Sequence, residues 1–251
     1  MSISLSQRVQ SIKPSQTLAI TARAKELREQ GQDIIGLGAG EPDFDTPDHI
    51  KDAAKQAIDD GFTKYTAVDG TPTLKQAIID KFSRDNQLYY DMNQILVSVG
   101  GKQTIFNLAQ ALLNPGDEII LTEPFYGYHR NLLELLGISI RFVKSAPPDW
   151  AIDVDAIEAA VTERTRAVLV NTPGNPSGKV WNRDELSRLL GVLERHDLYA
   201  LTDEIYEYML YDGRPHTSLA SLPGAYERTL TISGFSKTYN MTGWRLGYAV
   251  G

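Results

Sequence analysis

The sequence has 251 residues and no cysteine, and its 25 basic and 32 acidic side chains give a formal net charge of −7 at pH 7. The acidic balance argues against nucleic acid or an anionic membrane as the main partner, because both bind basic surfaces. The lack of cysteine excludes disulfides, thiolate metal sites, iron–sulfur clusters and a cysteine nucleophile, and it fits a cytoplasmic protein.

The first 45 residues are predicted to form an N-terminal arm and the start of a small-domain region. They contain no apolar signal core, and no run in the chain approaches the roughly 18 apolar residues of a membrane span. Apolar spacing predicts a helix over 17–30, with Gly31 as its stop. A short apolar piece, Ile34–Leu37, leads into the loop GAGEPDFDTP. Residues 46–251 are expected to form one large domain.

Two threonine–proline pairs are typical helix starts. Thr46 is predicted to be the N-cap of a helix that runs to about Asp60. Thr71 repeats the signal for a helix that runs to about Asn86. Each threonine offers a hydroxyl to a free N–H of the first turn, and the proline fits that turn because it needs no N–H there.

Beyond Gln94, strand-like and helix-like segments alternate. Strands are predicted at Ile95–Val99, Glu118–Thr122, Ser139–Val143, Ala167–Val170, Tyr199–Thr202, Thr229–Ile232 and Leu246–Val250. Helices are predicted at Gln103–Leu113, Gly127–Leu136, Val154–Val161 and Arg183–Arg195. Several strands are apolar throughout, as strands buried on both faces are. The alternation predicts an α/β fold with three layers, αβα, and a mostly parallel central sheet.

Several common site motifs are absent. GLGAGEP lacks the third glycine of the dinucleotide fingerprint, and GNPSGKV has the wrong glycine spacing for a phosphate loop. No metal site is predicted, because the four histidines lack metal-ligand spacing, and each is expected to be structural or exposed. They are His49, His129, His196 and His216.

Ligands of a parallel sheet bind beyond the carboxyl ends of its strands, and four polar segments lie at such ends. SVGGKQT joins a strand to a helix, where consecutive glycines and free N–H groups favour an anion, although an ordinary tight turn also explains it. NTPGNPSG follows the next strand of interest. It offers the amide of Asn175 to a ligand, or it is only a rigid turn.

The other two segments carry ionisable side chains. In TDEIYEY, Asp203 closes a buried strand and needs a cationic partner, and Tyr206 can present its hydroxyl to the same space. An acidic helix start is the alternative. In SGFSKTYNMTGWRLGY, Lys237 follows a strand end, and Arg245 comes later in the same segment. A partly desolvated lysine beside another cation becomes an amine nucleophile, whereas a lone lysine is ordinarily a solvated surface charge.

Together the segments supply what a pyridoxal phosphate site needs: a lysine, a buried acid, an amide and a phosphate cup. GEPDFDTP, KYT, VGGKQ, NTPGNPSG, DEIYE and SKTYNMTGWRLGY occur in this order. In these motifs the sequence resembles the class I aminotransferases of pyridoxal-phosphate fold type I, nearest to the aspartate/aromatic branch of bacteria and archaea. The resemblance covers nearly the whole chain and implies the large domain of that fold.

The resemblance implies three catalytic residues. Lys237 forms the Schiff base with the cofactor and moves the proton between the substrate Cα and the cofactor C4′. Asp203 pairs with the pyridinium nitrogen and keeps it protonated. Tyr206, together with Asn175, hydrogen-bonds the phenolic oxygen of the cofactor.

The resemblance also implies the remaining binding residues. The phosphate is held by Arg245 and Ser236 and by backbone groups of Gly101, Lys102 and Gln103. Tyr126 stacks on the pyridine ring and, with Asn175 and Gly40, lines the substrate side. Tyr65 reaches the phosphate of the neighbouring subunit, so the active unit is a homodimer.

The sequence departs from the family in three places. Many relatives have tryptophan where Tyr126 stands, and many have a hydroxyl residue where Gly234 stands. Family members usually continue well beyond GWRLGY into a small C-terminal domain, which carries the arginine that binds the substrate α-carboxylate. A C-terminally truncated aminotransferase, without that small domain, is therefore expected.

The expected activity is transfer of an amino group between an L-amino acid and a 2-oxo acid by a ping-pong route. Aspartate or glutamate is the first expected substrate, and an aromatic amino acid is the second. Two alternatives stay open. One is another fold type I enzyme that uses pyridoxal phosphate, such as a decarboxylase, a β-lyase or a synthase. The other is a non-catalytic truncated remnant or binding module.

Overall fold

A computed structural model describes residues 4–12, 16–36, 38 and 40–251, which form two units, Met1–Asp45 and Thr46–Gly251. The first unit contains helices α1 (Gln7–Ser11) and α2 (Gln16–Glu29). The bounds of α2 lie within one residue of the helix predicted over 17–30. In the predicted apolar piece that follows, residues 34–36 have no regular secondary structure, and Leu37 lies outside the described residues.

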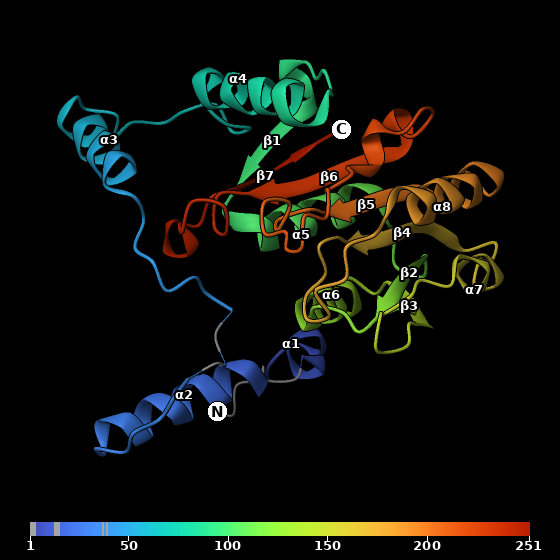
Figure 1. Cartoon of the computed structure of the whole chain (residues 1–251), viewed down its shortest axis with the longest axis horizontal. Coiled ribbons are helices and arrows are strands. Elements are labelled where there is room, and N and C mark those ends of the chain that lie inside the picture. Colours follow the sequence, from blue (N-terminus) through green and yellow to red (C-terminus); the bar gives the residue numbers. More distant parts are fainter. Residues whose placement is uncertain (1–3, 13–15, 37, 39) are drawn as a thin grey trace. The chain divides into compact units, whose positions relative to one another are not determined.

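The second unit is built on a seven-stranded sheet with the order β1-β7-β6-β5-β4-β2-β3. The strands are β1 (Ile95–Ser98), β2 (Glu118–Glu123), β3 (Ser139–Lys144), β4 (Thr165–Asn171), β5 (Tyr199–Asp203), β6 (Thr229–Gly234) and β7 (Gly247–Val250). Neighbours among β2 to β6 run parallel, and β7 is antiparallel to both β1 and β6. The predicted, mostly parallel sheet is confirmed (Figure 1).

Helices α4 (Pro72–Lys81), α5 (Gly100–Leu112), α6 (Gly127–Leu135), α7 (Val154–Ala159) and α8 (Arg183–Arg195) flank this sheet. Helix α3 (Asp48–Asp59) buries none of its residues and does not contribute to the core. A π-helical segment, η1 (Phe82–Asn86), continues α4, and short 3-10 turns occur at Met92–Gln94, Leu219–Ser221, Tyr226–Arg228 and Thr242–Trp244. Among the described residues, no helix is long and apolar enough to cross a bilayer.

The alternation of side chains along each strand divides the core into the predicted layers. In β4, Val168 and Val170 pack into a cluster with α7 and α8, whereas Ala167 and Leu169 pack into a cluster with α5 and α6. Successive residues of a strand point to opposite faces, so one apolar run serves both layers. A third cluster packs α4 against β1 and β7, where Tyr248 contributes its ring.

The two threonine–proline pairs begin their helices differently. Thr71 is the N-cap of α4, and its side chain accepts a hydrogen bond from the N–H of Leu74, as predicted. The predicted N-cap role of Thr46 is wrong, because Pro47 caps α3 without a side-chain bond. The Thr46 hydroxyl instead donates to the carbonyl of Asn240 at 2.6 Å and accepts from the indole of Trp244 at 3.0 Å. A tertiary contact has taken the hydroxyl that a local cap would use.

The carboxyl ends of the central strands meet at one edge of the sheet. Asn171, the last residue of β4, is paired with Asp203, the last residue of β5. Gly234, the last residue of β6, is paired with Gly247, the first residue of β7. Gly247 is also paired with Ser98 at the end of β1. The polar segments predicted to carry the chemistry therefore converge at this edge.

At the amino-terminal end of β2, one buried carboxylate binds side chains from β3 and from the loop before β4. Glu118, the first residue of β2, accepts hydrogen bonds from Arg141 Nε at 2.9 Å, Thr162 Oγ1 at 2.8 Å and Arg164 Nε at 3.0 Å. Its side chain is only 2% exposed, whereas the two arginines remain partly in solvent. These donors lower the pKa of the Glu118 carboxyl from 4.5 to about 2.

Replacing Glu118 with glutamine is expected to destabilise the chain by about 2 kcal/mol at pH 7, because two arginines lose a charged acceptor. The folded pKa lies below the ordinary value, so this stability is present above about pH 4.5 and is lost as the pH falls towards about 2. Urea unfolding at several pH values measures it. The control is Glu134→Gln, which alters an exposed pair with Arg130. Equal stabilities of the Glu118 variant and the parent chain at pH 7 would contradict the prediction.

Candidate functional site at the carboxyl edge of the sheet

Asp203 lies at the centre of this edge. The side-chain amide of Asn171 and the backbone N–H of Thr172 both donate to the Asp203 carbonyl at 3.0 Å. The backbone of the acid is thus held by the neighbouring strand. Asp203 is only 7% exposed, so its carboxylate needs a hydrogen-bond donor or a positive charge close by.

The main partner of the carboxylate is His129, from the first turn of α6. His129 Nε2 lies 3.2 Å from Asp203 Oδ2, and the histidine is completely buried. The ring of Tyr126 packs edge-on against the imidazole, with 5.5 Å between the ring centroids. His129 Nδ1 is buried and has no hydrogen-bond partner among the described residues. The other carboxylate oxygen, Oδ1, accepts a long hydrogen bond from the Ile205 N–H at 3.4 Å. His129 thus fixes the acid, and the two oxygens keep further lone pairs for a ligand.

A phenol, an amide and an amine share the space next to Asp203. The Asn175 side-chain amide donates to the Tyr206 hydroxyl at 3.3 Å. The Nζ atom of Lys237 lies 5.6 Å from the centroid of the Tyr206 ring. Burial raises the pKa of the Tyr206 phenol, and the hydrogen bond from Asn175 opposes that shift. Tyr206 is therefore neutral at physiological pH and can donate a hydrogen bond.

Lys237 sits in a turn that the backbone holds closed. The N–H of Met241 donates to the Ser236 carbonyl at 3.0 Å, and the N–H of Tyr239 donates to the Phe235 carbonyl at 3.1 Å. The rings of Phe235 and Tyr239 stack at 5.9 Å. Ser236 is buried beside the lysine in sequence. The turn presents the lysine directly after the carboxyl end of β6.

An anion cup forms where α5 begins. A Cβ built on Gly100 would lie 2.5 Å from Arg245 Nη2, so the guanidinium lies over the first turn of α5. Arg245 has a left-handed backbone and donates to the Thr242 carbonyl at 2.8 Å. The side chain of Gln103 accepts from the Val99 N–H at 2.6 Å. Gly101 and Lys102 belong to the first turn of α5, where backbone N–H groups have no acceptor within the helix and can bind a ligand. A helix start beside an arginine suits a phosphate.

The cup depends on a close approach of two backbones. A Cβ on Gly247 would lie 2.7 Å from the carbonyl carbon of Gly100 and from the nitrogen of Gly101. Such a distance is shorter than any normal contact, so a larger residue would push α5 away from β7.

Gly247→Ala is expected to weaken binding of pyridoxal phosphate at least tenfold and to cost about 2 kcal/mol of stability, because overpacking moves backbone. Titration of the cofactor by absorbance measures the first effect, and urea unfolding measures the second. The control is Gly243→Ala in the same segment, where an added Cβ meets nothing within 4 Å. Unchanged affinity in the Gly247 variant would refute the role of this close approach.

Gly234 lies where two strands approach each other closely. A Cβ at this position would lie 3.0 Å from the Leu246 carbonyl oxygen, and 3.1 Å from both Gly247 Cα and Ile205 Cδ1. In this chain β6 and β7 approach each other so closely that glycine fits best.

The other predicted residues are placed less directly. Tyr126 is next to His129, and the carbonyl of Lys102 accepts a hydrogen bond from the Tyr128 hydroxyl at 3.2 Å. Tyr65 lies between α3 and α4 with a fully exposed side chain. Gly40 belongs to the first unit. The roles of all the predicted site residues stay predictions.

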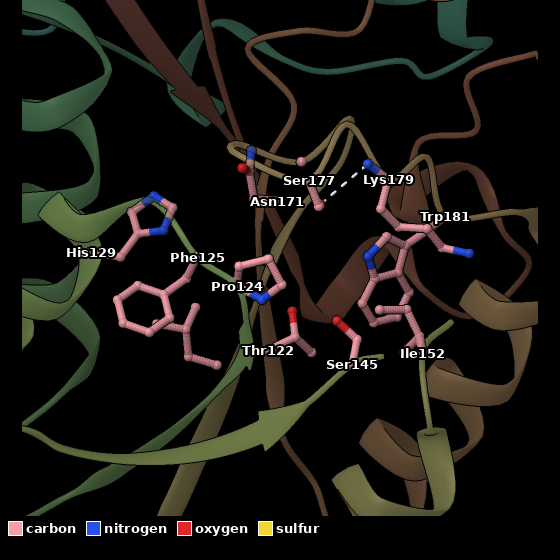
Figure 2. A pocket seen from close by; sticks show the side chains of 12 residues that line it. Thr122, Pro124, Phe125, His129, Ser145, Ile152, Asn171, Ser177, Lys179 and Trp181 are labelled. Atoms are coloured by element: carbon pink, nitrogen blue, oxygen red, sulfur yellow. Dashed lines mark hydrogen bonds between the residues drawn. The ribbon is translucent and has the colours of Figure 1, made fainter. Parts of the chain in front are cut away.

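A small pocket adjoins the site at the ends of β2 and β4 (Figure 2). It is lined by Leu121, Thr122, Pro124, Phe125, His129, Ser145, Ile152, Asn171, Gly174, Ser177, Lys179 and Trp181. His129 and Asn171, which both contact Asp203, form its border with the site. Sequence reasoning missed His129, since its spacing from any other polar residue carries no signal.

Comparison with known proteins connects this geometry to a family. A family model described as aminotransferase class I and II matches residues 32–251. The aspartate/prephenate aminotransferase of Cereibacter sphaeroides is 48% identical over 98% of this chain and 62% of its own length. The enzyme of the same name from Nitrosomonas europaea is 50% identical over 98% of this chain and 63% of its own length.

A solved structure shows the same fold. The aspartate aminotransferase from Thermus thermophilus with maleate superposes with a TM-score of 0.95 at 44% identity, over all of this chain and 65% of that chain. The present chain thus spans less than two thirds of the length of these relatives.

Proposed function

Because the chain belongs to the class I and II aminotransferase family, we propose that it transfers an amino group between an L-amino acid and a 2-oxo acid with pyridoxal 5′-phosphate as its cofactor. Aspartate or glutamate is the proposed amino donor, with an aromatic amino acid second. Two of its relatives are aspartate/prephenate aminotransferases, which supports an acidic amino donor.

The observation that carries this proposal is the grouping of Asp203, Tyr206 and Lys237 at and beyond the carboxyl ends of β5 and β6. The buried pair of Asp203 with His129 suits a protonated ring nitrogen, which a carboxylate holds by a charged hydrogen bond. The Asn175–Tyr206 pair suits a phenolic oxygen. The start of α5 beside Arg245 suits a phosphate. The residues of this site therefore fit pyridoxal phosphate.

When bound, pyridoxal phosphate carries the amino group and accepts the electron pair that remains when a proton leaves the substrate Cα. Lys237 Nζ would take this proton and deliver it again, because it is the amine beside the Tyr206 ring, at 5.6 Å from the ring centroid. Asp203 would hold the ring nitrogen by a hydrogen bond, with His129 as its fixed neighbour at 3.2 Å. Tyr206 and Asn175 orient the phenolic oxygen, and Arg245 neutralises the phosphate.

We propose a homodimer in which Tyr65 reaches the phosphate site of the partner, and a substrate side lined by Gly40, Tyr126 and Asn175. The full exposure of the Tyr65 side chain supports the first assignment, together with the exposed rings and branches of Phe62 and Val68 nearby in sequence. The cysteine-free composition is compatible with the proposed cytoplasmic location.

A half-reaction tests the proposed activity. The chain loaded with pyridoxal phosphate is mixed with aspartate in the absence of an oxo acid. One equivalent of free oxo acid per site is expected, with the amino group retained on the cofactor. Release of carbon dioxide or of ammonia instead would contradict amino transfer and favour a decarboxylase or a lyase.

A further inference from the structure

Four charged side chains are buried behind the turn that carries Asp203 and Tyr206. They are Lys81 from α4, Glu204 and Glu207 from the turn, and His216 from the loop that follows; we call them the buried quartet. Glu204 is 1% exposed, and the side chains of the other three are about nine-tenths buried. Charges so deep in a protein are costly unless they are paired.

The quartet consists of two ion pairs. Lys81 Nζ donates to both carboxylate oxygens of Glu207 at 2.6 Å and to Asn86 Oδ1 at 2.8 Å. Glu204 Oε2 lies 2.9 Å from His216 Nε2. The second oxygen of Glu204 accepts from the Ser218 hydroxyl at 3.0 Å. Each carboxylate thus has one basic partner of its own.

The charge of the quartet depends on one proton. With His216 protonated, two negative and two positive charges cancel; with His216 neutral, a buried net charge of −1 remains. Burial disfavours the imidazolium, but the hydrogen bond and charge of Glu204, with the charge of Glu207, outweigh it and raise the pKa of His216. Burial also raises the pKa of the Glu207 carboxyl, which Lys81 opposes.

Other titratable groups face the quartet from the elements packed around it. They are the phenols of Tyr90, Tyr208 and Tyr248, whose pKa values are all raised, first of all by burial, and Asp85, which pairs with Arg84 and Tyr208. These phenols stay neutral across the range in which a histidine titrates. Glu204, Glu207 and His216 could also surround a cation, but the Lys81 ammonium already holds both oxygens of Glu207.

The quartet is joined directly to the candidate site. Glu204 follows Asp203 in sequence, and Glu207 follows Tyr206. The N–H of Glu204 donates to the Ile232 carbonyl at 2.8 Å, and the N–H of Glu207 donates to the Glu204 carbonyl at 3.0 Å. The two glutamates of this turn therefore bind Lys81 and His216, whereas Asp203, at its start, binds His129.

We propose that the buried quartet holds the turn from Asp203 to Tyr206 in place, and that it does so fully only while His216 is protonated. Glu204, Glu207, Lys81 and His216 are then positioning residues that touch neither substrate nor cofactor. The effect of the quartet on cofactor affinity rests on the proposed function, whereas the effect of the quartet on the turn does not.

Hydrogen exchange of the 251-residue chain without cofactor tests the effect on the turn. A histidine with a raised folded pKa stabilises fully below its ordinary pKa of about 6.5 and loses that effect as the pH rises through the folded value. Protection factors of the Glu204 and Glu207 amides are therefore expected to fall above that pH, by roughly tenfold for each unit of pKa shift. His216→Gln is expected to show the low protection at every pH.

The matched control is His196→Gln, which alters an exposed histidine that contacts Glu158 at 3.0 Å. It is expected to keep the pH step of the parent chain. A parent chain without a pH step in these amides overturns the proposal, and this measurement needs no variant to fold. A step that persists in the His216 variant also overturns it, because another group would then be titrating.

Cofactor titration over the same pH range separates the two proposals. We expect the dissociation constant for pyridoxal phosphate to rise at the same pH as the midpoint of the exchange step. We expect a dissociation constant that does not change with pH in His216→Gln. If the parent chain binds no cofactor at any pH, the proposed function fails while hydrogen exchange still decides the quartet. If the cofactor binds with a flat pH profile while the exchange step is present, the coupling to the site is refuted.

Discussion

Replacing Lys237 with alanine is expected to lower the rate of amino transfer by at least about 10⁴-fold. The change removes both the amine that holds the cofactor and the group that carries the Cα proton, and a positioned proton carrier alone is worth roughly 10²–10⁴-fold. The side chain extends from a closed turn at the end of β6, next to the Tyr206 ring, so the fold should tolerate the truncation. Release of oxo acid from aspartate in a single turnover measures the effect.

Lys144→Ala is the matched control for this experiment. Lys144 is the exposed last residue of β3, so its loss removes the same charge without touching the site. The control is expected to react at the rate of the parent chain. A Lys237 variant that keeps more than about one tenth of the parent rate would show that another group performs the proton transfer.

Replacing Asp203 with asparagine is expected to lower the same rate by about 10³-fold while the chain stays folded. The amide has nearly the shape of the carboxylate and can still hydrogen-bond to His129, which lies 3.2 Å away, so packing is retained. The negative charge opposite the ring nitrogen is lost. Fixed charges in a water-poor site are typically worth roughly 10²–10³-fold each.

The control for the charge is Asp155→Asn, because Asp155 pairs with Arg188 on the surface and its side chain is 86% exposed. We expect it to leave the rate unchanged. Thermal unfolding of both variants separates lost chemistry from lost structure. A rate within about tenfold of the parent for the folded Asp203 variant would refute the electrostatic role of this acid.

Most of the sheet could be predicted because its strands carry a strong local signal. The β4 run is apolar on both faces, and its alternate residues do pack into two separate clusters. Local signals failed where a tertiary contact competed with them. Thr46 and Thr71 have the same proline neighbour, yet only Thr71 caps its helix, because Thr46 bonds to Asn240 and Trp244 instead.

The candidate site could be predicted only in part. Strand ends and ordered motifs indicate Asp203 and Lys237, since parallel strands bring their carboxyl ends to one edge. The partner of the acid could not be found in this way, because His129 and Asp203 are 74 positions apart. The pairing of Lys81 with Glu207 spans 126 positions and likewise leaves no trace in local spacing.

The most direct test of the cofactor site is to trap the cofactor and locate it. The purified chain is incubated with pyridoxal phosphate, reduced with borohydride and digested, and the labelled peptide is identified by mass spectrometry. We expect one equivalent of label on Lys237 and an absorbance band that shifts when an amino acid is added before reduction. No label, or label spread over surface lysines such as Lys144, would contradict a cofactor site at the carboxyl edge of this sheet.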